Sequence, residues 1–339
     1  MSASSSLADI ISLLKQQPHS VQHCRTACTA LAGHIELDLS AAMIQRAVAA
    51  GAVELLVDCL RVHKSDQVIC HHACCALFYI ALHVAGQVKT IRCGGVEAVV
   101  DCLRLHRADK DVCHQSCYAL INLANSEAGK VQAIGCGGVE AVVDCLRVHR
   151  ADKDVCHRGC WALSNLEVSE AGKVKAIDCG GVEAVVDCLR VHRADKDVCH
   201  RGCYALVNVA IGEAGQVKAV GCGGVEAVVD CLRVHRAEKD VCFQVSAVLN
   251  NLAFSEAGQV KAIGCGGVEA VVACLQLHSQ DSGVTLRGIW ALANIAGLVS
   301  GRPQLKQAGA HLAAEQALQQ FKDNKDICEL AEVLRSRLS

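Results

Sequence analysis

Hydrophobic and polar residues recur along this chain with the spacing of helices. In residues 139–148, the apolar side chains Val139, Val142, Val143 and Leu146 follow an i, i+3, i+4, i+7 pattern, which puts them on one face of a helix. No stretch shows the strict alternation that is typical of a strand. The chain is therefore predicted to be all-α.

Three helices of this kind are predicted in succession. A short one begins after Ser126, a plausible N-cap, and ends at Gly137-Gly138, since glycine tolerates the left-handed conformation of a helix end. A second helix covers residues 139–148. Asp152 then caps a third, longer helix, because a carboxylate can accept hydrogen bonds from the first free backbone amides.

This three-helix pattern repeats along the chain. The string CGGVEAVVDCL begins at Cys93, Cys136, Cys179 and Cys222, a close variant begins at Cys265, and every step is 43 residues. A period of this size indicates a helical solenoid with atypical end repeats. The predicted organisation is a cap of helices at 1–40, six repeats at 41–83, 84–126, 127–169, 170–212, 213–255 and 256–298, and a degenerate C-terminal capping repeat at 299–339.

The repeat resembles the armadillo repeat of beta-catenin and importin-alpha. The resemblance lies in the glycine pair, the amphipathic helix and a longer helix that ends in a W-A-L-x-N element, seen at Trp161–Asn165 and Trp290–Asn294. It covers nearly the whole chain. It implies a right-handed superhelical α-solenoid whose third helices line a concave groove.

The resemblance also implies what the groove does. In the family, the asparagine amides hydrogen-bond the backbone of an extended peptide, and the aromatic rings form slots for its side chains. An amide offers donors and an acceptor whatever the peptide sequence. At 43-residue spacing the corresponding positions here are Tyr118, Asn122, Trp161, Asn165, Tyr204, Asn208, Asn251, Trp290 and Asn294.

The residues one turn earlier on these helices indicate the charge of the partner. They are neutral or basic, whereas the groove of importin-alpha-like adaptors gains acidic residues that select basic signals. Arginine pairs well with carboxylates and phosphates, so we expect an acidic or phosphorylated segment. These positions are Gln115, Arg158, Arg201, Gln244 and Arg287.

Other interpretations of the same pattern remain open. The asparagines could satisfy backbone carbonyls of a neighbouring repeat and bind nothing. The solenoid could be a structural protein that associates end to end, or a nuclear-transport-type adaptor. We expect a monomer that binds another protein, with end-to-end association as the alternative.

The chain holds 24 cysteines, and most fall at positions where a helix needs a buried apolar residue. Free cysteine packs as a small hydrophobe, so we expect thiols in the core and neither a cofactor nor a metal. Zinc binding by Cys/His pairs and thiol redox chemistry are the alternatives. A histidine ends each second helix, where an imidazole suits the negative end of the dipole. These histidines are His63, His106, His149, His192, His235 and His278.

Composition and the absence of known motifs exclude several classes of function. A net charge of −2 and 3% aromatic residues argue against a nucleic-acid partner. No apolar run reaches the roughly 18 residues that span a bilayer. The N-terminus lacks the features of a signal peptide, so the expected location is the cytoplasm, with the nucleus as an alternative. No P-loop, G-x-S-x-G or H-E-x-x-H motif is present, and we expect no enzymatic activity.

Overall fold

The computed structural model describes residues 6–339, and every regular element in that range is a helix. The first five residues of the predicted N-terminal cap lie outside the described residues. The chain divides into two compact units, Met1–Lys175 and Ala176–Ser339, which we describe separately. Each unit is an all-α solenoid built from the three-helix pattern, which confirms the predicted fold class.

The N-terminal unit holds the first eleven helices and the start of the twelfth. Its helices are α1 (Leu7–Gln16), α2 (Val21–Leu37), α3 (Ala41–Ala49), α4 (Ala52–Val62), α5 (Gln67–Ile80), α6 (Val84–Arg92), α7 (Gly95–Leu105), α8 (Lys110–Leu123), α9 (Glu127–Gly135), α10 (Gly138–Val148), α11 (Lys153–Leu166) and α12 (Glu170–Asp178).

The C-terminal unit begins within α12. Its further elements are α13 (Gly181–Val191), α14 (Lys196–Val209), α15 (Glu213–Gly221), α16 (Gly224–Val234), α17 (Lys239–Leu252), α18 (Glu256–Gly264), α19 (Gly267–Leu277), α20 (Ser282–Ile295), the 3-10 helix η1 (Val299–Gly301), α21 (Arg302–Gln307), α22 (Ala310–Gln320) and α23 (Lys325–Leu338).

Local signals set the helix boundaries as predicted. The Oδ1 atom of Asp152 accepts hydrogen bonds from the backbone amides of Asp154 and Val155, each at 3.1 Å, and so caps α11. Gly137 lies between α9 and α10 with φ of 78°, in the left-handed region that favours glycine. The chain therefore turns at the first glycine of each pair and begins its second helix at the next residue.

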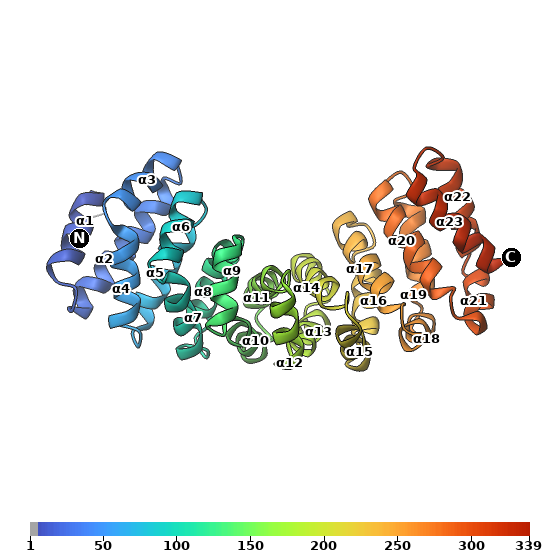
Figure 1. Cartoon of the computed structure of the whole chain (residues 1–339), viewed down its shortest axis with the longest axis horizontal. Coiled ribbons are helices and arrows are strands. Elements are labelled where there is room, and N and C mark those ends of the chain that lie inside the picture. Colours follow the sequence, from blue (N-terminus) through green and yellow to red (C-terminus); the bar gives the residue numbers. More distant parts are fainter. Residues whose placement is uncertain (1–5) are drawn as a thin grey trace. The chain divides into compact units, whose positions relative to one another are not determined.

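The third helices of successive repeats pack side by side. In the N-terminal unit, α5 contacts α2 on one side and α8 on the other, and α8 contacts α11 (Figure 1). Helices α1 and α2 thus take the places of a second and a third helix, so the N-terminal cap is a repeat without its first helix. In the C-terminal unit, α17 contacts α14 and α20, and α20 contacts α23.

All 24 cysteines lie in the described part of the chain as free thiols, and none has an exposed side chain. The thiols of Cys113 and Cys199 each donate a hydrogen bond to a neighbouring cysteine, and this bond, followed by burial, raises their pKa. A thiol whose pKa is raised stays protonated and unreactive. The prediction that cysteines fill the core is confirmed.

The role of the second-helix histidines differs from the one we predicted. They end their helices, but the ring of His149 reaches the preceding repeat, where Nε2 lies 2.9 Å from the carbonyl oxygen of Arg107. Because a carbonyl only accepts, Nε2 carries the proton. The same contact joins His106 to the Lys64 carbonyl at 2.7 Å. These histidines therefore connect neighbouring repeats, and the negative end of their own helix is not their partner.

Within residues 6–339, no single helix combines the length and the apolar character needed to cross a membrane. Two bent helix pairs meet that test by length and composition only, Glu256–Gly264 with Gly267–Leu277 and Ser282–Ile295 with Val299–Gln307.

Candidate peptide-binding face

Each third helix buries one side and leaves a polar and aromatic stripe partly open to solvent. We call these stripes, taken together within a unit, the third-helix face. In the N-terminal unit the predicted site residues on it are Gln115, Tyr118 and Asn122 of α8 and Arg158, Trp161 and Asn165 of α11. In the C-terminal unit they are Arg201, Tyr204 and Asn208 of α14, Gln244 and Asn251 of α17, and Arg287, Trp290 and Asn294 of α20.

Tyr118 lies in the middle of a three-layer stack. The ring of Phe78 on α5 covers one face, with centroids 4.0 Å apart and planes inclined by 7°. The guanidinium of Arg158 on α11 covers the ring too, at 3.7 Å from its centroid. Stacking of this kind holds the arginine over the ring. A partner therefore meets the edge and hydroxyl of Tyr118 and the outer side of Arg158.

Arg287 takes a related position in the C-terminal unit. Its guanidinium carbon lies 5.3 Å from the ring centroid of Phe243 on α17 and 5.7 Å from that of Trp290. Two rings from neighbouring helices thus hold one cation. The arrangement again presents a positive charge beside partly exposed aromatic rings.

Neither of these two arginines is neutralised by the protein itself. Among the residues that the structure describes, Arg158 and Arg287 form no ion pair. The Nε atom of each is buried and has no hydrogen-bond partner in that part of the chain. A buried donor without a partner carries a desolvation cost.

Three histidines on this face add no charge near neutral pH. Burial lowers the pKa of His72, His114 and His200, and the neighbouring cations Arg158 and Arg201 lower it further for His114 and His200. Their imidazoles are therefore neutral at pH 7. The positive charge of the face comes from its arginines.

The asparagines form hydrogen bonds inside the protein. Asn165 Nδ2 donates to the Ile121 carbonyl at 3.0 Å and to Asn125 Oδ1 at 3.2 Å. Asn122, Asn251 and Asn294 likewise donate to a carbonyl 44 residues earlier, at 3.1–3.2 Å. Asn122 and Asn208 are each only 9% exposed. The amide donors thus tie adjacent repeats together, and the Oδ1 atoms are what remains for a partner.

Sequence reasoning missed four apolar residues of this face. Phe78 and Phe243 lie in the aromatic–arginine contacts described above. Ile211 and Phe254 lie two residues beyond the ends of α14 and α17 and are 62% and 61% exposed. They hold the position of Asn125, which touches the asparagine of the following repeat. Reading the 43-residue register one turn beyond each asparagine would have found both.

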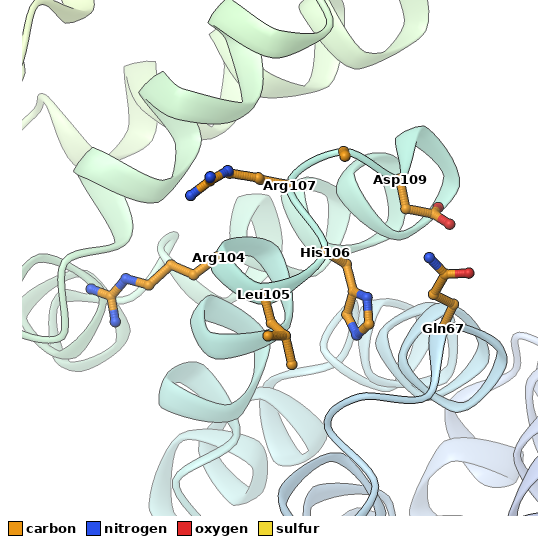
Figure 2. A pocket seen from close by; sticks show the side chains of 7 residues that line it. Gln67, Arg104, Leu105, His106, Arg107 and Asp109 are labelled. Atoms are coloured by element: carbon orange, nitrogen blue, oxygen red, sulfur yellow. The ribbon is translucent and has the colours of Figure 1, made fainter.

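An open surface depression of about 520 Å³ lies elsewhere, at the turn between α7 and α8 (Figure 2). Arg104, His106, Arg107 and Asp109 line it together with Gln67 of α5. His106 is engaged with the Lys64 carbonyl, so this depression is the outer side of an inter-repeat contact. It brings together none of the predicted site residues.

Comparisons with known proteins support the fold. The chain is similar to a crystal structure of an engineered protein, with a TM-score of 0.81 and 26% identity over 98% of this chain and 78% of that one. A second engineered protein matches with a TM-score of 0.62 and 28% identity over 74% of this chain and 98% of its own.

A third similar structure carries the description that a conserved phosphorylation switch controls the interaction between cadherin and beta-catenin in vitro and in vivo. Its TM-score is 0.82 at 17% identity, and the match covers 97% of this chain but 60% of that one. No protein-family model matches the chain, and no curated protein sequence matches it. The similarity therefore shows an all-helical repeat fold.

Proposed function

We propose that this chain is a non-enzymatic scaffold that binds an extended acidic or phosphorylated segment of another protein on its third-helix face. The observation that carries the proposal is the state of Arg158 and Arg287. Each is held against aromatic rings, has no ion-pair partner among the described residues, and keeps a buried Nε without a hydrogen bond.

The chemistry of these positions favours carboxylates and phosphates. A guanidinium that is stacked on a ring keeps its edge free, and that edge can form two parallel hydrogen bonds to an anion. Stacking also restricts the side chain before binding, so less conformational entropy is lost when the ligand arrives. A basic segment would place like charges together and is disfavoured.

Apolar side chains of the partner have complementary surface nearby. Ile211 and Phe254 are exposed beside the asparagine positions of the C-terminal unit, and large rigid rings contribute binding area at low entropic cost. The Oδ1 atoms of Asn165 and Asn294 can accept hydrogen bonds from backbone amides of the partner. The expected partner sequence therefore combines acidic or phosphorylated residues with apolar ones.

A peptide-display selection on the purified chain tests this proposal. The library contains acidic, basic and phosphoserine-bearing members, and the variants Arg158→Gln and Arg287→Gln are selected in parallel. Arg107→Gln is the matched control, because it removes the same charge from the exposed turn between α7 and α8. Fluorescence anisotropy of an enriched peptide then gives the dissociation constants.

We expect acidic or phosphorylated sequences to be enriched by the parent and by Arg107→Gln. Arg158→Gln and Arg287→Gln should each weaken binding of the enriched peptide about tenfold, which corresponds to roughly 1.4 kcal/mol of binding free energy. Added salt should weaken binding further, because exposed charges are screened. Enrichment of basic sequences, or equal affinity in all variants, would contradict the proposal.

A further inference from the structure

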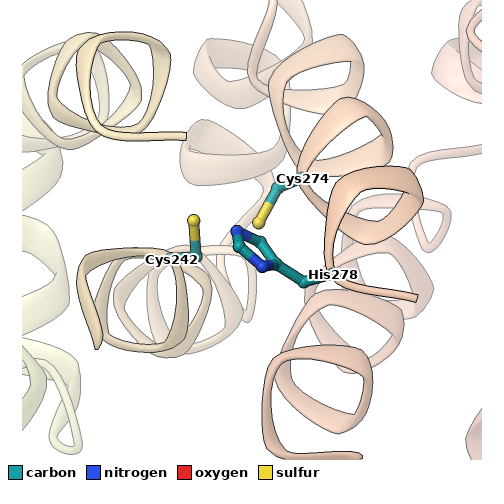
Figure 3. Close-up of side chains that lie close together, drawn as sticks. All are labelled: Cys242, Cys274 and His278. Carbon is teal, nitrogen blue, oxygen red and sulfur yellow. The ribbon is translucent and has the colours of Figure 1, made fainter. Parts of the chain in front are cut away.

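One cluster of side chains in the C-terminal unit departs from the general pattern of buried thiols. The sulfurs of Cys242 on α17 and Cys274 on α19 and a ring nitrogen of His278 all lie within 4.8 Å of one another (Figure 3). Figure 3 shows the imidazole pointing into the space between the two sulfurs. All three residues are buried, at most 8% exposed. Within residues 6–339, this is the one His/Cys/Asp/Glu group of three with such close donor atoms.

The cluster joins two repeats through elements that the fold already holds together. Cys242 comes from the third helix of one repeat, and Cys274 and His278 come from the last turn and C-cap of the second helix in the next. The spacing i, i+4 puts Cys274 and His278 on the same side of α19. Backbone packing therefore brings the donors together without help from a ligand.

A serine distinguishes this cluster from the preceding repeat. There the third helix carries two cysteines, Cys199 and Cys203, and both hydrogen-bond Cys231. Ser246 holds the position of Cys203, one turn after Cys242. Its hydroxyl is fully buried and has no hydrogen-bond partner in the described chain. By equivalence with Cys203, it faces Cys274.

One backbone carbonyl group holds two of the three side chains close together. The carbonyl oxygen of Arg236 accepts from His278 Nε2 at 2.8 Å and from the Cys242 thiol at 3.3 Å. Both hydrogen bonds are neutral and are weak beside a metal–thiolate bond. Exchanging them for a cation needs rotation of side chains but no movement of helices.

We propose that Cys242, Cys274 and His278 bind a zinc ion that links the two repeats. Zinc–sulfur bonds of about 2.3 Å and zinc–nitrogen bonds of about 2.0 Å place tetrahedral donors roughly 3.5–3.8 Å apart. The three donor atoms here lie within 4.8 Å of one another, so small side-chain rotations bring them to that spacing. Two thiolates and one Zn²⁺ sum to zero charge, which suits a buried site. An oxygen completes the tetrahedron, either the Ser246 hydroxyl or a water molecule that it holds.

The proton balance of binding is defined. Cys242 and Cys274 each release one proton to solvent, and the imidazole binds through the lone pair of one nitrogen while the other carries its single proton. No oxidant or reductant takes part. The site is closed to substrates by burial, so its role is structural, and it is independent of the third-helix face.

Cobalt(II) substitution tests the site on the full-length chain. The protein is purified metal-free under a non-coordinating reductant, titrated with Co²⁺, and then back-titrated with Zn²⁺. The variants are Cys242→Ser, His278→Gln and Ser246→Cys, with Cys199→Ser as the matched control. Cys199 holds the position of Cys242 one repeat earlier, is equally buried, and lies 3.1 Å from the Cys231 sulfur.

We expect one tightly bound Co²⁺ per chain with the visible bands of a tetrahedral thiolate site, because no other group of three in residues 6–339 brings its donor atoms this close. Binding to the metal-free protein should release two protons per ion, and Zn²⁺ should then displace Co²⁺ stoichiometrically without further proton release. Cys199→Ser should keep these bands, whereas Cys242→Ser and His278→Gln should lose them. The glutamine can still donate to the Arg236 carbonyl, and circular dichroism checks that the fold is retained.

Ser246→Cys introduces the residue that the preceding repeat already accommodates, so it should fold. It should strengthen the sulfur-to-cobalt charge-transfer band and tighten binding. Absence of tetrahedral bands in the parent would overturn the proposal. So would equal loss in Cys199→Ser and Cys242→Ser, since the metal would then be held diffusely by thiols, and so would an unchanged spectrum in Ser246→Cys.

Discussion

Glu167 is a buried carboxylate at a position where the other repeats have alanine. It follows α11 as its C-cap, is 1% exposed, and its Oε2 has no hydrogen-bond partner among the described residues. The equivalent residues are Ala81, Ala124, Ala210, Ala253 and Ala296. Burial raises the pKa of Glu167 well above its ordinary value, because the charged form is poorly solvated there.

Glu167→Ala is therefore expected to stabilise the protein. Leaving a buried polar group unsatisfied costs about 1–3 kcal/mol. Removing one buried methylene opposes this gain by about 0.8 kcal/mol. The net increase in the free energy of unfolding at neutral pH should be about 1 kcal/mol.

The pH dependence has a definite sign. In the unfolded chain a glutamate has a pKa of about 4.3, whereas the native pKa is higher, so the native state binds more protons between the two values. The contribution of Glu167 to the free energy of unfolding of the wild type is thus fully present below about pH 4.3. It is lost as the pH rises through the native pKa of Glu167. The advantage of alanine should be small in acid and grow toward neutral pH.

Denaturant unfolding at several pH values measures this difference, and hydrogen exchange at α11 reports it locally. Glu167→Gln separates charge from polarity, since it should remove the pH-dependent part alone. Glu170→Ala is the control, because that side chain is 81% exposed and lies in the first turn of α12. A Glu167→Ala protein that is less stable than wild type, or whose advantage does not change with pH, would refute the reasoning.

Three further predictions concern the contacts between and within repeats. Asn165→Ala should lower the free energy of unfolding by about 1–2 kcal/mol, since it leaves the Ile121 carbonyl without its donor. Thermal unfolding measures this change. An unchanged stability would show that the hydrogen bond contributes nothing. Gly129→Ala should destabilise strongly, because its new Cβ would clash with the backbone carbonyl oxygen of Leu123. A tolerated substitution would contradict that close approach. Gly135→Ala on the same helix meets no atom within 4 Å and should stabilise by about 0.5–1 kcal/mol in the same assay, whereas a loss of stability would be the contrary result.

Local chemistry explains why the helices could be predicted from the sequence. The Asp152 cap and the Gly137 turn depend on residues within a few positions of each other, so their signals are visible in a short window. Because the pattern recurs every 43 residues, helix boundaries predicted correctly in one repeat apply to the others as well. The packing of cysteines in the core follows from the same apolar periodicity.

Contacts between repeats were harder to read. The direction of the Asn165 amide depends on where the Ile121 carbonyl lies, 44 residues away, and the pattern alone left both the binding and the packing role open. The stack of Phe78 on Tyr118 depends on a ring that only one repeat carries at that position. The cluster of Cys242, Cys274 and His278 combines donors 32 and 36 residues apart, which is outside any short metal-binding motif.

The histidine contact between repeats bears on how such an array changes length over generations. His149 and the Arg107 carbonyl are 42 residues apart, as are His106 and the Lys64 carbonyl. Recombination that gains or loses whole 43-residue segments within a unit leaves each histidine facing an equivalent carbonyl. An insertion of one or two residues in the turn would misalign the contact at that junction. The chain can therefore be lengthened or shortened in whole periods without loss of these contacts, whereas smaller length changes would break them at one junction.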